Sequence, residues 1–564
     1  MRGSAVPAPG RTVFWVIVVL GALARMEQFA ARGSVWSDEA MLALNVASRS
    51  FGELLAPLNH DQYAPLLFLW SERLGVLAAG VSEWTLRAVP LLSGIFLIIV
   101  VGILTRRLLG NAAAVVAMTI TAFCPALIFY STEAKPYGVD ALVSAGLVYL
   151  AVTVVDQPDS RRALGVLLMA GVLAIWLSSP AVFTLAGVGA ALLLVRPPIT
   201  PARILAVGGC WAVSFVTAYV LFYSRASLSE YITQFWADTY FDLGSLESVI
   251  ESCVLVIATM RGVFLGASSF AERITGPYAM ALLLWLLLLP LGLIGAVHAG
   301  RIRGAWVPVL LLGPGLAMAL TSLLGMYPMV ARFALFAVPL WIVLVAGGIS
   351  WIGSMLPPSW RPAGILILTL WLPLIGIPQD RAWVVRAEQW NEASQVIEKL
   401  RQASSVKAPI YINALGVPVW LFYTTNWAEP DLIRLSTLVG WTERGGPAFE
   451  NAPSRGRAVV LGEGSRLVLH RAGTEIVGLP TGMQLRSRRG IAQPLPDPGW
   501  AQNEIWRLKQ IGRPEVWLVF FHSFDSAHLF LTRALDAAGG RLLQRIEGRE
   551  AYAYLYDLSG VAFQ

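Results

Sequence analysis

The sequence predicts a polytopic α-helical membrane protein that carries a soluble α/β domain in its C-terminal third. Three observations support this fold class. Of the 564 residues, 56% are hydrophobic and only 14% are charged, whereas ordinary soluble domains carry about 25% charged residues. Apolar segments of about 20 residues recur before residue 380, the length that crosses a hydrocarbon core as a helix. Beyond that point charge rises and the apolar runs shorten.

The apolar runs predict about eleven spanning helices. Arginines occupy every second link between them, and the positive-inside rule therefore places these links and the N-terminus in the cytoplasm. The stretch 249–267 is apolar enough to be a twelfth or re-entrant helix, although Arg261 favours an interfacial segment. If it spanned, everything after it would change sides. The expected spans are 12–30, 86–105, 111–130, 138–155, 163–178, 180–195, 204–222, 277–297, 305–323, 332–351 and 362–378.

Residues 1–380 are thus expected to form a transmembrane domain, and 381–564 an extracytoplasmic α/β domain. Within the latter, the stretches APIYINAL, RAVVLGE, EVWLVFFHS and EAYAYLYDL predict strands, which alternate with helical patterns at 387–403 and 525–539. His522 and His528 have poor spacing for a metal site, and no phosphate loop, dinucleotide fingerprint or zinc spacing appears. The basic residues lie at the ends of apolar segments, a pattern of membrane topology that gives no indication of nucleic-acid binding.

Two adjacent carboxylates, Asp38 and Glu39, follow the first apolar run, in a long outer loop expected over residues 31–85. With Ser37 as the N-cap, they could simply complement the dipole of a helix. Neighbouring helix positions point about 100° apart, so the two side chains would rarely serve one ligand equally. We therefore expect one of them to do chemistry while the other is held structurally.

Further polar side chains fall in the same expected outer loops, and each has a structural explanation of its own. A loop entering a helix at a proline, a snorkelling arginine and an incidental ion pair would account for them singly. Together they combine carboxylates, suited to proton abstraction, with cations, suited to an anionic group at headgroup depth. They are Asp61, Tyr63, Arg87, Glu133, Lys135, Tyr137 and Arg332.

In this order the motifs resemble those of GT-C glycosyltransferases of the protein-mannosyltransferase and aminoarabinose-transferase type, over roughly residues 12–350. Asp38-Glu39 follows the first helix, and residues 61–66 read DQYAPL where relatives commonly read Asp-x-His-Pro-Pro-Leu. Leu86-Arg87 opens the second helix, and residues 133–137 read EAKPY where relatives usually read Glu-Ala-Arg-Pro-Tyr. Arg332-Phe333 stands where relatives often read Arg-Tyr. A soluble outer domain after the helices is also common in this group.

The resemblance implies a GT-C-type fold in the cell's inner (plasma) membrane, with the active site and the C-terminal domain outside. Such enzymes move a sugar, with inversion, from a polyprenyl-phosphate carrier to a hydroxyl of a lipid, glycan or protein acceptor. By this resemblance Asp38 would be the general base, and Arg332, Lys135 and Arg87 would hold the phosphate. Glu39 and Asp61 would orient the acceptor or a cation.

Two departures from the family pattern affect these expectations. Tyr63 and Ala64 replace the usual histidine and first proline, which puts any metal or acceptor role of that histidine in doubt. Lys135 keeps the charge of the usual arginine but loses its bidentate fork. Some relatives use a divalent metal and others do not, so this cofactor stays open and the sequence names no other.

Two other function classes fit parts of the pattern. A transporter or flippase of an anionic lipid would use the same acids and cations, but these groups fall at one face, and no inverted repeat is evident. A membrane scaffold with an outer binding domain would leave the loop acids dispensable. Transfer from a radiolabelled polyprenyl-phosphate sugar separates the enzyme from both.

The arginine pattern predicts that the C-terminus is outside the cytoplasm. A reporter that works only in the cytoplasm, fused after Gln564, is expected to be inactive, and one that works only outside is expected to be active. The opposite result would make the stretch 249–267 a true spanning helix.

Overall fold

A computed structural model describes most of the chain, and it divides into two compact units. The first comprises Met1–Arg32, Ala64–Arg225 and Thr239–Ala387, and the second Gly33–Tyr63, Ala226–Asp238 and Glu388–Gln564. The residues described are 11–31, 33–195, 200–225, 236, 239–264, 277–375, 392–403, 408, 410–413, 416–424, 458–461, 466–471, 474–479, 498–510, 512–521 and 527–561.

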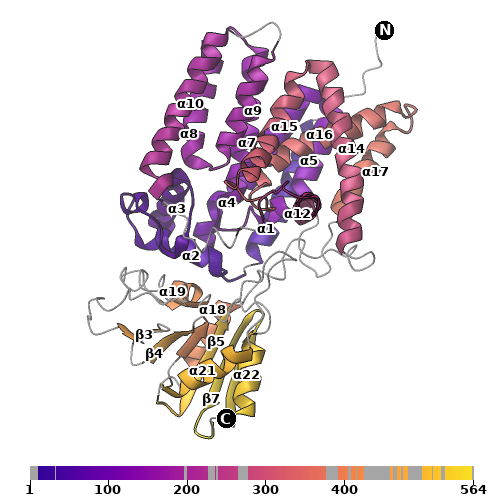
Figure 1. Cartoon of the computed structure of the whole chain (residues 1–564). Helices are drawn as coiled ribbons and strands as arrows, with labels where there is room; N and C mark the ends of the chain where they lie inside the picture. Colours follow the sequence, from indigo (N-terminus) through magenta and orange to yellow (C-terminus); the bar gives the residue numbers. More distant parts are fainter. Residues whose placement is uncertain are drawn as a thin grey trace. The chain divides into compact units, whose positions relative to one another are not determined.

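The first unit is helical, and each of the eleven predicted spans is wholly or largely helix (Figure 1). Seven helices among the described residues are long and apolar enough to cross a membrane, namely α1, α4, α7, α10, α14, α15 and the helix at 335–355, while α5, α9 and α17 are shorter apolar helices. The bounds are α1 Arg11–Ala30, α3 Leu66–Ala79, α4 Glu83–Leu109, α5 Asn111–Phe123, α6 Pro125–Phe129, α7 Tyr137–Asp156, α8 Arg161–Leu177, α9 Ala181–Leu193, α10 Pro201–Leu221, α12 Leu246–Phe264, α14 Pro277–Arg303, α15 Trp306–Leu323, α16 Val338–Met355 and α17 Arg361–Ile375, with short 3-10 helices η3 Tyr223–Arg225 and η5 Leu335–Ala337.

Two predicted spans differ from the structure. The span predicted over 111–130 is broken at Cys124, whose extended backbone (φ −65°, ψ 119°) separates α5 from α6. Pro125 causes the break, because the residue before a proline avoids the helical region and proline lacks the N–H that would continue the helix. The span predicted from 332 begins only at Val338, with Pro339 in its first turn. Arg332 therefore lies in a turn before the helix.

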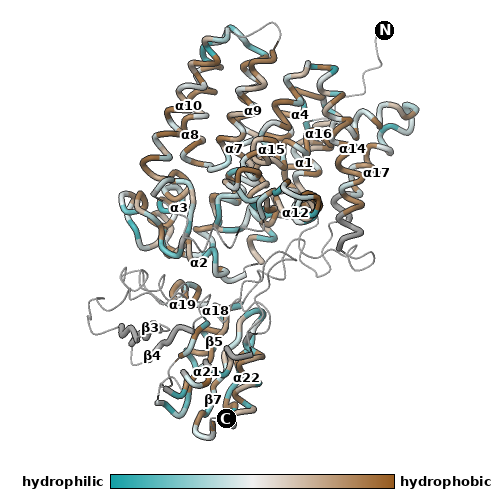
Figure 2. The backbone as a smooth tube through the Cα atoms, viewed as in Figure 1, coloured by the Kyte–Doolittle hydropathy of each residue, from teal (hydrophilic) through white to brown (hydrophobic). Residues whose placement is uncertain are grey.

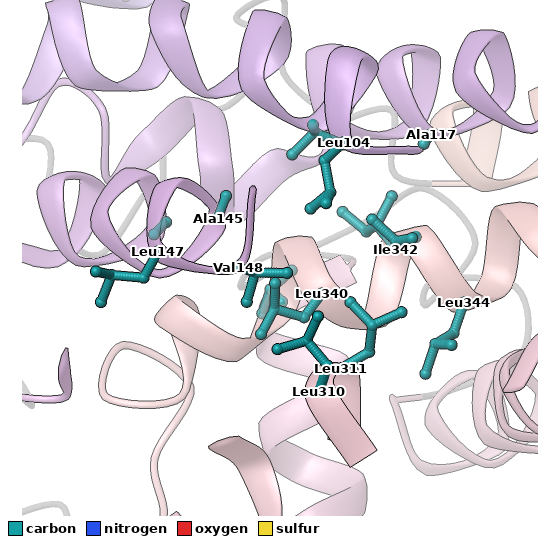
Figure 3. Packing of buried hydrophobic residues seen from close by; sticks show 14 of the residues in the cluster. Leu104, Ala117, Ala145, Leu147, Val148, Leu310, Leu311, Leu340, Ile342 and Leu344 are labelled. Atoms are coloured by element: carbon teal, nitrogen blue, oxygen red, sulfur yellow. The ribbon is translucent and has the colours of Figure 1, made fainter. Parts of the chain in front are cut away.

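Buried aliphatic side chains hold the helices of the first unit together. Leu104 of α4, Ala117 of α5, Val148 of α7, Leu310 of α15 and Ile342 of α16 all belong to one core cluster (Figure 3). Apolar side chains are also exposed on the outside, for example Met169 of α8 and Leu205 of α10, and Figure 2 shows hydrophobic colour along α8, α9 and α10. Apolar residues on both the inner and the outer face are typical of helices that lie in lipid.

Helices α14 and α16 cross at a pair of glycines. A Cβ atom added to Gly295 would lie 1.8 Å from the Leu344 carbonyl oxygen, and one added to Gly348 would lie 2.1 Å from the Leu291 carbonyl oxygen. The two backbones therefore touch directly. Such close approach through small residues is the usual way that membrane helices gain van der Waals contact in the absence of a hydrophobic driving force.

The second unit contains a mixed sheet of seven strands in the order β2-β3-β4-β1-β5-β7-β6. Strand β1 pairs in parallel with β4 and β5, and the remaining pairs are antiparallel. All four predicted strands are confirmed, as β1, β2, β5 and β7. The strand bounds are β1 Ile410–Asn413, β2 Ala458–Leu461, β3 Arg466–Arg471, β4 Thr474–Leu479, β5 Glu515–Phe521, β6 Arg541–Gly548 and β7 Ala551–Asp557.

The helices of the second unit come from two distant parts of the sequence. The C-terminal part supplies α18 Ala393–Gln402, α19 Val417–Thr424, α21 Pro498–Gln510 and α22 Ala527–Ala537. Of the two predicted helical patterns, 525–539 corresponds to α22 and 387–403 to α18, with residues 387–391 outside the described part of the chain. The segment Gly33–Tyr63 adds α2 Ser37–Ser48 and two 3-10 turns, η1 Glu53–Leu55 and η2 Asn59–Asp61.

Candidate active site

The carboxylate pair lies in the first turn of α2, and its two members have different surroundings. Trp36, and not the expected Ser37, is the N-cap residue. The Glu39 carboxylate accepts a hydrogen bond from the Trp36 backbone N–H at 3.3 Å, which is the return half of a capping box. Glu39 is 1% exposed, whereas Asp38 is half-buried. Glu39 is thus committed to the start of the helix, whereas Asp38 is only half-buried.

Asn45 of α2 and Arg49, the C-cap residue of this helix, hold the following loop. The Asn45 side chain donates to the Asn59 carbonyl at 3.1 Å and accepts from the Asn59 N–H at 2.7 Å. One turn later, Arg49 donates to the Pro57 carbonyl and to the Asn59 side-chain oxygen, each at 2.9 Å. Because these bonds satisfy backbone groups of the loop, they fix its path next to α2.

His60 occupies the strained point of this loop. Its backbone is left-handed, with φ 62°, and its side chain is 1% exposed. Burial lowers the pKa of His60 to about 3, so the imidazole is neutral. Of the two site residues predicted here, Tyr63 is partly exposed, and the side chain of Asp61 lies outside the described part of the structure.

In the first unit, the predicted residues Glu133, Lys135 and Tyr137 lie in the buried segment that follows the break at Cys124. Residues 130–141 are all buried, and the charged side chains of Glu133 and Lys135 are each 3% exposed. The turn is tight, because the Lys135 N–H donates to the Glu133 carbonyl at 2.7 Å. Charged groups in such surroundings are costly and usually functional.

Arg332 lies beside Tyr137, which is 195 residues away in sequence. Its guanidinium carbon is 6.0 Å from the centre of the Tyr137 ring and 5.4 Å from that of Phe333. Tyr137 and Phe333 are themselves 6.0 Å apart, and Tyr327 is 5.8 Å from Phe333. The turn before η5 therefore places Arg332 against an aromatic wall, formed by the rings of Tyr137, Phe333 and Tyr327, next to the N-terminus of α7. The predicted motifs at 133–137 and 332–333 thus lie side by side.

A buried acid that sequence reasoning missed lies one turn into α7. Asp140 is 7% exposed, and Ser178, from the link between α8 and α9, lies beside it. Among the residues that the structure describes, the Asp140 Oδ1 and Ser178 Oγ atoms have no hydrogen-bond partner. Burial, and then the nearby Asp140 carboxylate, raise the pKa of Tyr327. These polar groups retain hydrogen-bonding capacity that a bound molecule could use.

Arg87 is the fifth residue of α4 and is 8% exposed. It precedes Gly94 by seven residues, which is two helical turns and therefore the same face of α4. A Cβ atom at Gly94 would lie 2.4 Å from the Ser131 Cβ atom, so this face approaches the buried turn that carries Glu133 and Lys135. Arg87 thus lies on the face of α4 that packs against this turn.

A second residue that the sequence analysis missed is Arg25 of α1, whose side chain is 0% exposed. Its guanidinium donates to the Gly21 carbonyl in its own helix at 3.0 Å, and to the carbonyls of Thr121 and Ala122 at 3.0 and 2.9 Å. Thr121 and Ala122 belong to the last turn of α5, where carbonyls have no partners within the helix. Arg25 therefore caps the broken helix, and its charge complements the negative end of the helix dipole.

Among the described residues, no three His, Cys, Asp or Glu side chains are grouped so as to hold a metal ion. His528 instead stacks on Tyr552, with 3.9 Å between ring centres, and burial lowers its pKa to about 4. His522 lies outside the described part of the chain. The predicted site residues thus form two groups, with Asp38, Glu39 and Tyr63 in one unit and Arg87, the turn at 133–137 and Arg332 in the other.

Comparisons with known proteins agree with this architecture. A family model described as dolichyl-phosphate-mannose-protein mannosyltransferase matches residues 63–223. ArnT from Cupriavidus metallidurans bound to undecaprenyl phosphate aligns with a TM-score of 0.52 at 14% identity, covering 98% of this chain and 99% of that one. Its apo form aligns with a TM-score of 0.51 at 14% identity, covering 98% and 100%. A comparison with curated protein sequences found no significant match.

The Archaeoglobus fulgidus oligosaccharyltransferase in complex with Zn and sulfate aligns less closely, with a TM-score of 0.41 at 14% identity. The match covers 74% of this chain and 61% of that chain, which is less than two thirds of its length. The similarity to ArnT shows a shared fold. The predicted resemblance to GT-C glycosyltransferases is thereby confirmed, and the chain is an integral membrane protein with many helices and a C-terminal domain that contains a sheet.

The buried His60 predicts a pH dependence of the loop that it anchors. Its folded pKa, about 3, lies below the unfolded value of 6.5. Its stabilising contribution is therefore complete above pH 6.5 and is lost as the pH falls toward 3, at about 1.4 kcal/mol per pH unit. Hydrogen exchange of peptides from residues 53–63, corrected for the intrinsic rate, is expected to show this loss. The variant His60→Asn keeps the left-handed backbone but cannot titrate, and an equal pH dependence in it would contradict the assignment.

Arg25 predicts a large effect of a single substitution on stability. Arg25→Met leaves the last carbonyls of α5 without donors in a region that water does not reach, and we expect a loss of at least about 2 kcal/mol. Arg106→Met removes an exposed arginine from the last turn of α4 and serves as the matched control. Melting temperatures of the two purified variants in one detergent measure the difference. Equal shifts would show that Arg25 does not cap α5.

Proposed function

We propose that this protein is a membrane glycosyltransferase that moves a sugar from a polyprenyl-phosphate carrier to an acceptor hydroxyl, with inversion, at the extracytoplasmic face of the membrane. The GT-C-type fold, the family match over residues 63–223 and the order of the sequence motifs support this proposal. The different surroundings of Asp38 and Glu39 give the proposal its main support. Of the two adjacent acids, Glu39 is committed to capping α2, while Asp38 stays partly exposed beside it.

In this mechanism the Asp38 carboxylate accepts the proton of the acceptor hydroxyl as its oxygen attacks the anomeric carbon. The bond between that carbon and the phosphate oxygen breaks, and polyprenyl phosphate leaves with the electron pair. Attack on the face opposite the leaving group inverts the anomeric configuration. General-base catalysis of this kind contributes about 10²–10⁴-fold to the rate.

The cations of the first unit suit the phosphate of the donor. Lys135 and Arg87 are almost completely buried, and Arg332 is half-buried against an aromatic wall. In surroundings that exclude water, a charge-assisted hydrogen bond to phosphate is worth more than the same bond at a wet surface. These residues would also stabilise the negative charge that develops on the leaving oxygen, which is the direction in which electrostatic catalysis acts.

The polar groups around Asp140 suit the sugar. Asp140 Oδ1 and Ser178 Oγ have unused hydrogen-bonding capacity, and Tyr327 lies near them with Phe183 against its ring at 5.0 Å between centres. Aromatic faces combined with a buried acid and a hydroxyl match the alternating apolar and hydroxyl-bearing surfaces of a sugar ring. The acceptor hydroxyl belongs to a lipid, a glycan or a protein, and each class is compatible with this scheme.

The carboxylate pair gives the decisive test. Asp38→Asn keeps the size of the side chain but removes the basic oxygen, and turnover is expected to fall about 10²–10⁴-fold with donor binding largely intact. Glu39→Gln keeps a side-chain oxygen for the Trp36 N–H, so turnover is expected to fall far less. Initial transfer rates from a saturating radiolabelled polyprenyl-phosphate sugar, measured in one detergent, compare the variants with the wild type.

Near wild-type turnover in both variants would refute the catalytic role of this pair. A large loss of turnover in Glu39→Gln alone would identify Glu39 as the general base and would leave the proposed enzyme class unchanged. A wild-type protein that binds polyprenyl phosphate but transfers no sugar to any acceptor class would favour a lipid transporter.

A further inference from the structure

The segment in front of α2 is bonded to two helices from the C-terminal part of the same compact unit. The Val35 backbone N–H donates to the Tyr423 hydroxyl of α19 at 2.9 Å. The Ser394 backbone N–H, in the first turn of α18, donates to the Ser34 hydroxyl oxygen at 3.0 Å, and the two serine hydroxyls lie 2.9 Å apart. Adjacent residues of the segment thus contact both helices.

These bonds matter because the groups they satisfy are buried. Val35 is 0% exposed and Ser34 is 5% exposed. A buried backbone N–H without an acceptor costs about 1–3 kcal/mol, and water cannot replace the Tyr423 hydroxyl there. The bonds from α18 and α19 therefore help to hold the segment at this position.

Helix α2 itself also depends on these partners. Ten of its twelve residues are buried, where a helix at a surface would leave about half of them exposed. It packs against α19, in which Val419, Leu421 and Phe422 are buried. Side chains of α19, which is far from α2 in sequence, therefore help to bury α2.

Asp38 lies three residues after Val35, at the start of this helix. A short, rigid stretch of chain transmits displacement directly, because three residues span at most about 10 Å. A shift of the segment at Val35 would therefore move the Asp38 carboxylate. Misplacement of a catalytic group by about 1 Å can cost about a hundredfold in rate.

We propose that Tyr423 and Ser394 of the C-terminal domain are positioning residues that hold the start of α2, and with it Asp38, in place for catalysis. This inference rests on the proposed function of Asp38 and assigns a role to the C-terminal domain. The domain would then be a structural part of the catalytic machinery, and its presence would be needed for turnover even though it need not touch the substrate.

Hydrogen exchange in the full-length protein tests the holding contact without any reference to activity. Tyr423→Phe keeps the ring and removes the hydroxyl that accepts from the Val35 N–H, and peptides covering residues 33–48 are expected to exchange about two- to tenfold faster. Tyr556→Phe is the matched control, because it removes another tyrosine hydroxyl of the domain, one that donates to Asp536 at 2.9 Å. In the control, exchange over 33–48 is expected to match the wild type.

Transfer kinetics test the consequence. Tyr423→Phe and Ser394→Ala are expected to lower kcat about tenfold while the KM for the polyprenyl-phosphate sugar stays within about twofold. Ser394→Thr retains the hydroxyl and is expected to restore most of the turnover. Tyr556→Phe is expected to turn over like the wild type.

The two readouts separate failure of this inference from failure of the proposed function. Unchanged exchange over residues 33–48 in Tyr423→Phe would overturn the holding contact. Faster exchange with unchanged kcat would overturn the positioning role, as would a loss of turnover that Tyr556→Phe shares. A wild-type protein without transferase activity would refute the proposed function, and the exchange data alone would then decide whether the domain holds α2.

Discussion

The buried guanidinium of Arg25 is the interaction on which the proposed donor site depends. A helix that ends inside a membrane leaves carbonyls that water cannot satisfy, and α5 ends at Phe123 because Pro125 follows. Arg25 supplies the missing donors from the neighbouring helix α1. With the break satisfied, the chain can turn within the helical unit and present Glu133 and Lys135 as buried charges. Without Arg25, the last carbonyls of α5 would lack these donors inside the membrane, and the turn that follows would be less stable.

The packing around the turn leaves little freedom for it. Gly94 of α4 approaches Ser131 so closely that a methyl group would not fit, and it also lies next to the Arg25 guanidinium. The ring of Tyr137 then contacts Tyr130 on one side and Phe333 on another. Direct contact of backbones and rings, rather than filling by flexible side chains, fixes the position of the buried charges. Such rigidity is what electrostatic preorganisation requires.

Sequence reasoning predicted the helices well, because each apolar run carries its own signal in composition. It predicted four strands of the sheet for the same reason. The break at Pro125 was overlooked because apolar residues continue on both sides of it, although the proline itself was a usable signal. Arg25 and Asp140 were missed because single charges inside apolar runs form no spacing pattern. A charge inside a membrane segment is energetically costly, however, so its presence alone was a usable signal of function. The bond from Glu39 to the Trp36 N–H could not be predicted from a motif, because tryptophan is not a usual N-cap residue and Ser37 offered a better one. The hydrogen bond between Ser34 and Ser394 could not be predicted either, since no local pattern links residues 360 positions apart.

That separation has a consequence for biosynthesis. Residues 33–63 leave the ribosome early, but the helices that bond to them are encoded about 360 residues later. At about 5–20 residues per second, translation takes roughly 20–70 seconds to reach α18 and α19. During this interval the acid-bearing segment lacks the partners that bury it, while the helices between are being inserted. Maturation of the loop that carries Asp38 is therefore a late event, and a nascent chain that stops before residue 423 carries the acidic motif without the assembled loop.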